Sequence, residues 1–73
     1  MMIDFLDIVD FDSPNYKLKQ DENGNWEARR TSNTWCVEFT NLYRNIRDYY
    51  ELILTHPKNP RFDEDVDLII FRK

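Results

Sequence analysis

The sequence predicts a small α+β domain with the element order β-β-β-α-β: a small antiparallel sheet with one long amphipathic helix packed on one face. Apolar residues between positions 34 and 54 recur at helical spacing, whereas residues 16–30 and 66–72 show the features of strands. A chain of 73 residues has room for one hydrophobic core, so we expect a single domain over residues 1–73.

The first stretch, residues 3–11 with the sequence IDFLDIVDF, is compatible with two structures. Its Ile, Val and Phe residues favour a strand. Its aspartates at positions 4, 7 and 10 recur every three residues, which is typical of one edge of a helix. We expect the strand and keep the helix as the alternative, with a turn at residues 12–15.

Residues 16–20 and 26–30 are expected to pair as a β-hairpin. A two-residue turn at positions 23–24 would place the apolar residues of the two strands on opposite faces. A three-residue loop over residues 22–24 places them on one face. That loop requires a left-handed residue at its last position, where the sequence has Gly24, the single glycine of the chain. We therefore predict the three-residue loop with a bulge.

A long helix is expected over Thr34–Leu54, after a cap within residues 32–34 and before His56-Pro57. Six apolar residues with spacings of 4, 3, 4, 3 and 4 fall on one side of it: Trp35, Phe39, Leu42, Ile46, Tyr49 and Ile53. A second row widens this face: Cys36, Tyr43, Tyr50 and Leu54. The alternative is a strand at residues 34–40, with the helix starting at Asn41.

Residues 66–72 are the clearest strand of the sequence. Val66, Leu68 and Ile70 face one way, and Ile69 and Phe71 face the other. Because a strand that is apolar on both faces usually lies inside a sheet, we expect this strand to have a neighbour on each side.

Acidic residues gather at the two ends of the chain. The net charge is −4, from 14 acidic and 10 basic residues. If the two ends meet in space, they would form an acidic rim, with the aromatic residues Trp26 and Tyr50 as candidate anchors for a partner. The rim would consist of Asp4, Asp7, Asp10, Asp12, Asp63, Glu64, Asp65 and Asp67.

No pattern in the sequence favours catalysis, and we expect no enzyme, no metal and no cofactor. The single cysteine, Cys36, and the single histidine, His56, would lie near opposite ends of the predicted helix, too far apart for a catalytic pair. The acidic runs at residues 21–25 and 63–67 resemble the start of a calcium loop, but both lack the required glycine at the sixth position and glutamate at the twelfth.

Membrane and nucleic-acid binding are also disfavoured. No apolar run approaches the 18 residues of a membrane span, and the acidic N-terminus is unlike a signal peptide, so we expect the cytoplasm of the host cell. A basic aromatic patch would suit nucleic acid, but the net negative charge repels phosphate. The residues of that candidate patch are Arg29, Arg30, Arg44, Arg47, Trp26 and Tyr43.

The acidic rim favours protein binding. Carboxylates spaced along a rigid surface can occupy a basic groove built for nucleic-acid phosphates. We expect a small inhibitor of the kind typical of phages and mobile elements, an antagonist of host defence that blocks a larger nucleic-acid-binding enzyme by DNA mimicry. One alternative is an assembly module that forms a homodimer or docks through its aromatic helix face. Another is that the charges only protect strand edges from aggregation.

Overall fold

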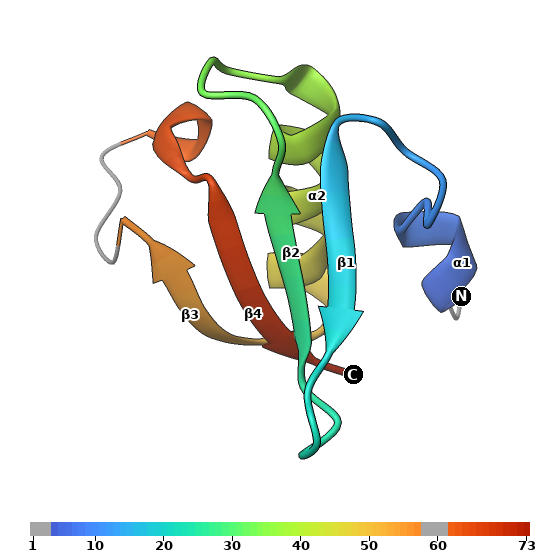
Figure 1. Ribbon diagram of the computed structural model, residues 1–73. Helices are drawn as coiled ribbons and strands as arrows, with labels where there is room; N and C mark the ends of the chain where they lie inside the picture. The colour runs from blue at the N-terminus through green and yellow to red at the C-terminus, as the bar shows by residue number, and fades with distance from the viewer. Residues whose placement is uncertain (1–3, 58–61) are drawn as a thin grey trace.

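The computed structural model describes residues 4–57 and 62–73, which form a four-stranded antiparallel sheet with one main helix across one face (Figure 1). The strands lie in the order β1-β2-β4-β3. The helices are α1 (Phe5–Ile8), α2 (Val37–Tyr49) and the short 3₁₀ helix η1 (Asp63–Asp65). The strands are β1 (Tyr16–Gln20), β2 (Trp26–Arg30), β3 (Glu51–His56) and β4 (Leu68–Arg72).

The α+β class is confirmed, but the predicted order β-β-β-α-β is wrong, since the main elements run β-β-α-β-β. The first predicted strand is replaced by the alternative, the helix α1 at Phe5–Ile8. Its helical turn is closed by the Val9 N–H, which donates to the Phe5 carbonyl oxygen at 3.0 Å. The helix alternative is therefore confirmed only in part, since Asp7 alone of the three aspartates lies within α1 and the chain is extended at Val9.

The hairpin has the predicted three-residue loop. Leu18 pairs with Ala28, and the last pair before the loop is closed by the Asp21 N–H, which donates to the Asn25 carbonyl oxygen at 2.9 Å. Gly24 has φ of +86°, the left-handed conformation that the loop requires, and its N–H donates to the Asp21 carbonyl oxygen at 3.1 Å.

The predicted helix over Thr34–Leu54 is wrong at both ends, because α2 covers only Val37–Tyr49. The alternative strand at residues 34–40 is also wrong, since the described helix already includes Val37–Thr40. The inner members of the apolar stripe are the buried ones, whereas Trp35, Tyr49 and Ile53 are 56 %, 52 % and 45 % exposed.

The chain leaves the helix at Tyr50 and continues directly into β3, which pairs with β4. The sequence ELILTH fits a helical stripe and a strand equally well, so periodicity alone did not separate the two. Pairing with β4 decides it, with Leu54 opposite Ile70 and Thr55 opposite Ile69. The register of this pair shifts between Leu52 and Leu54, which marks an irregularity at Ile53.

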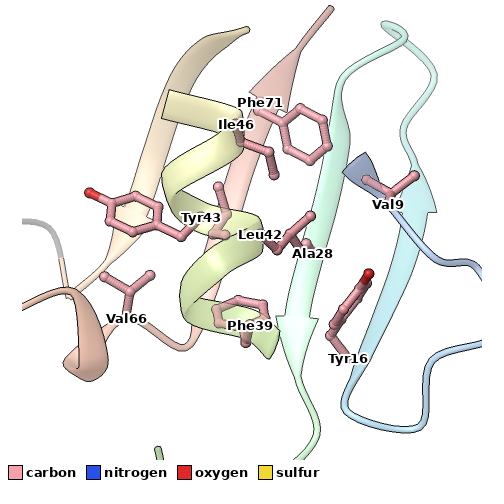
Figure 2. Packing of buried hydrophobic residues seen from close by; sticks show 10 residues of the cluster. Val9, Tyr16, Ala28, Phe39, Leu42, Tyr43, Ile46, Val66 and Phe71 are labelled. Carbon is pink, nitrogen blue, oxygen red and sulfur yellow. The ribbon is translucent and has the colours of Figure 1, made fainter. Parts of the chain in front are cut away.

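Strand β4 lies between β2 and β3, as its two apolar faces predicted. It begins at Leu68, so Val66 precedes the strand and is buried in the core instead of sharing the face of Leu68 and Ile70. Ile69 and Phe71 are completely buried beneath α2, and Leu68 and Ile70 are partly buried on the opposite face. Figure 2 shows the core between α2 and the sheet. The buried apolar residues are Val9, Tyr16, Ala28, Phe39, Leu42, Tyr43, Ile46, Val66, Ile69 and Phe71.

The hairpin loop gives a first test of the fold. We expect Gly24→Ala to lower the free energy of unfolding by about 1 kcal/mol, because an L side chain is strained in the left-handed region. A Cβ at this position would meet only the Gln20 side-chain nitrogen at 3.8 Å, so no steric clash is added. Gly24→Asn should cost less, since asparagine tolerates this conformation. Urea denaturation of the wild type and the two variants measures this order of stability. An unchanged denaturation midpoint for Gly24→Ala would contradict the prediction.

Candidate protein-binding surface

The N-terminal segment, residues 4–12, which includes α1 beside β1 in Figure 1, carries an acidic surface, and we call it the acidic arm. Its four aspartates are all exposed, and none forms an ion pair with another residue in the described part of the chain. Two apolar side chains stand among them, Leu6 at 66 % and Phe11 at 51 % exposed. The arm thus combines negative charge with apolar area. Its aspartates are Asp4, Asp7, Asp10 and Asp12.

An aromatic cluster holds the start of the arm on the domain. The Phe5 ring lies 5.3 Å from the Trp26 ring, 5.8 Å from that of Tyr50 and 6.2 Å from that of Phe71, measured between centroids. The Lys73 ammonium nitrogen lies 4.3 Å from the centre of the Phe5 ring. Trp26 and Tyr50, expected as anchors for a partner, are therefore half-buried and engaged with the arm.

Burial of two side chains and one hydrogen bond hold the end of the arm. Val9 and Ser13 are buried at 4 % and 2 % exposure. The Asp10 N–H donates to the Tyr16 hydroxyl oxygen at 2.8 Å, and burial raises the pKa of Tyr16 above its ordinary value. The arm is fixed at several points while its carboxylates point outward.

The second acidic group, residues 63–67, is largely engaged within the domain. The Asp63 carboxylate accepts a hydrogen bond from Arg44 Nε at 2.8 Å, and Arg47 Nη1 lies 3.5 Å away. The hydrogen bond from Arg44 lowers the pKa of Asp63. The Asp67 carboxylate lies 2.9 Å from His56 Nδ1. Only the remaining two carboxylates of this group, those of Glu64 and Asp65, are exposed.

The structure does not join the two acidic groups into one rim. The opening residues do meet the end of the chain, through the contacts of Phe5 with Phe71 and Lys73. However, β4 separates residues 63–67 from that end, and Figure 1 shows α1 beside β1 while η1 lies across the sheet, on the side of β3. The rim expected from the sequence is therefore two surfaces. All four carboxylates of the arm are exposed, compared with two in the second group.

The aromatic helix face proposed as an alternative docking surface is mostly covered by the sheet. Tyr43 is only 7 % exposed, and Tyr50 is half-buried beside Phe5. The candidate basic patch is also divided. Arg44 and Arg47 engage Asp63, and Arg30 donates to the Glu64 carbonyl oxygen at 3.1 Å.

A pocket of about 240 Å³ lies at the hairpin end of β1 and β2. Its polar lining comes from the hairpin turn and from Lys19 and Glu27, which pair at 3.5 Å. The described residues contain no group of three or more His, Cys, Asp or Glu side chains that could hold a metal ion. No helix among residues 4–57 and 62–73 is long and apolar enough to cross a membrane.

Sequence reasoning missed the two exposed apolar residues of the arm, Leu6 and Phe11. In a strand over residues 3–11, Phe11 would share a face with Phe5 and Asp7, so the alternation did not identify either face as buried or exposed. The signal that could have found Phe11 is its position between Asp10 and Asp12, where a buried ring would require two neighbouring carboxylates to approach the core.

The anchoring of the arm by Tyr16 is testable. We expect Tyr16→Phe to lower the free energy of unfolding by about 1 kcal/mol, because the partly buried Asp10 N–H loses its acceptor. Hydrogen exchange at the Asp10 amide should become faster. Tyr49→Phe is the matched control, since Tyr49 is 52 % exposed. Equal effects of the two substitutions would contradict this assignment.

The Asp63 ion pair should make stability depend on pH. Since Arg44 lowers the folded pKa of Asp63, the stabilisation is present above the ordinary carboxylate pKa of about 4 and is lost as the pH falls through the folded value. Asp63→Asn should therefore reduce the free energy of unfolding at neutral pH, and the difference from the wild type should shrink in acid. Asp65→Asn, at an exposed carboxylate, is the control. Urea denaturation at neutral and at acidic pH measures the free energies of unfolding. The assignment is contradicted if the difference between the wild type and Asp63→Asn is the same at the two pH values.

Comparison of the chain with models of protein families, with curated proteins and with solved structures finds no match.

Proposed function

We propose that the protein is a non-catalytic binding protein whose acidic arm docks into a basic, nucleic-acid-binding groove of a larger protein and inhibits it. The observation that supports this most directly is the state of the four aspartates of the arm. They are exposed, they lack ion pairs with other described residues, and they lie on a segment fixed to the domain by buried anchors.

Fixed carboxylates favour docking for an energetic reason. A disordered acidic segment loses conformational entropy when it binds, whereas the arm is already held by Phe5, Val9 and the hydrogen bond from Asp10 to Tyr16. Less of the interaction energy is then spent on ordering the arm. The negative charge would also steer the encounter with a basic groove and speed association.

The exposed apolar residues of the arm add contacts that nucleic acid phosphates lack. Leu6 and Phe11 would lose solvent-exposed area on docking, and buried apolar area contributes about 25 cal/mol per Å² before the costs of association are subtracted. A partner for this surface would therefore combine basic side chains with neighbouring apolar ones. The acidic group at residues 63–67 is assigned a smaller role, since Asp63 and Asp67 already have partners within the domain.

The proposal is tested with a partner identified by pull-down from the native cell and then purified. The variant Asp4→Asn, Asp7→Asn, Asp12→Asn removes three charges from the arm and keeps Asp10, whose carboxylate accepts the Asp12 N–H at 2.9 Å. We expect about a tenfold or greater loss of affinity at low salt, because several complementary charges are removed together. Binding of the wild type should weaken as salt is raised, and DNA should compete with it.

The matched control removes three exposed charges elsewhere: Glu22→Gln, Asp48→Asn and Asp65→Asn. It has the same net charge as the arm variant, so a non-specific effect of charge would affect both equally. The proposal is overturned if the two variants bind alike, or if DNA and the wild-type protein bind the partner simultaneously.

A further inference from the structure

The face of the sheet opposite α2, which we call the open face, is not covered by any helix or strand of the described chain (Figure 1). Side chains alternate along strands, and Leu18, Ala28 and Ile69 pack on the α2 side. Their neighbours therefore lie on the open face. These neighbours are Lys17, Lys19, Glu27, Arg29, Leu68 and Ile70, and Leu54 joins them because it pairs with Ile70.

The half of the open face on β1 and β2 is positively charged. It contains Lys17, Lys19 and Arg29 and a single acidic residue, Glu27, so its net charge is three minus one, or +2. Glu27 lies 3.5 Å from Lys19 Nζ and 3.9 Å from Arg29 Nε. One carboxylate thus serves two cations whose side chains are 75 % and 62 % exposed. This positive surface stands out in a chain with a net charge of −4.

Apolar residues lie directly beside this charge. The strand registers place Leu68 next to Arg29, and Ile70 between Glu27 and Leu54. Leu68 and Ile70 are only partly buried, and Leu54 is 37 % exposed. The open face therefore combines basic and apolar groups, which is the complement of the acidic arm with its exposed Leu6 and Phe11.

We propose that the acidic arm of one copy docks on the open face of a second copy. The two surfaces are opposite in charge, and both carry apolar side chains. This inference uses the arm as a docking segment, as the proposed function does, and adds a second copy of the chain as an occupant. The arm cannot serve its own open face, because Phe5 packs against Trp26 and Phe71 on the α2 side of the sheet.

The contact is heterologous, since it joins two different surfaces. Each added copy leaves one free arm and one free open face, so the association continues into short chains unless the geometry closes a ring. An arm that is docked on a neighbouring copy is not available to another partner. Self-association and partner binding are therefore expected to compete.

Sedimentation of the full-length protein over a range of concentrations tests the inference. At low salt the weight-average mass should rise with concentration to at least twice the monomer mass, and high salt, which screens the charges, should return it to the monomer. A wild-type protein that stays monomeric at high concentration and low salt overturns the inference.

Charge reversal identifies the surfaces. The arm variant carries Asp4→Lys, Asp7→Lys and Asp12→Lys, and the face variant carries Lys17→Glu, Lys19→Glu and Arg29→Glu. Each should remain monomeric alone, because the two surfaces then have the same sign, and an equimolar mixture should associate again. Association of either variant alone at the wild-type level, or a mixture that stays monomeric, counts against the inference.

Two further measurements keep the outcome decisive. If circular dichroism shows that a reversed variant is unfolded, the neutral variants with Asn and Gln at the same positions replace it, and each should reduce the association. The face variant retains the native arm, so it should still bind the partner of the proposed function. If the face variant loses self-association and still binds the partner, only the open face is specific to self-association. If the wild type self-associates but the neutral arm variant binds the partner as the wild type does, the self-association stands and the proposed function fails.

Discussion

The packing of three α2 side chains on the middle of the sheet is the interaction on which the rest of the structure depends. Phe39, Leu42 and Ile46 are at most 2 % exposed, and they lie in one cluster with the completely buried Ala28 and Ile69 of the central strands. Figure 2 shows the three helix residues beside Ala28. Burial of each large apolar side chain contributes about 1.5 to 3 kcal/mol, which is substantial for a domain whose total stability is about 5 to 15 kcal/mol.

The elements predicted well from the sequence are those fixed by local chemistry. The hairpin followed from matching the apolar faces and from the left-handed requirement at Gly24. The central position of β4 followed from its two apolar faces. The C-terminal end of α2 could not be obtained in this way, because β3 is defined by its pairing with β4, a contact between segments distant in the sequence.

In the candidate binding surface, too, local sequence predicted some features and contacts between distant segments decided the others. The sequence located every acidic residue, but the pairing of Asp63 with Arg44 and of Asp67 with His56 depends on how α2, β3 and β4 are brought together. Charge counted along the chain therefore overstated what the second acidic group offers to a partner. For the arm, local composition was sufficient to find the carboxylates, while the anchoring of Phe5 required the tertiary structure.

The irregularity at Ile53 has a consequence for the outer edge of the sheet. Strand β3 lies at an edge and exposes Ile53 and Leu54, which is the composition that invites cross-β growth. The shift of register between Leu52 and Leu54 breaks the even spacing of backbone donors and acceptors along that edge. An incoming flat strand would find its hydrogen bonds out of step, so fibril formation by stacking of this edge is disfavoured.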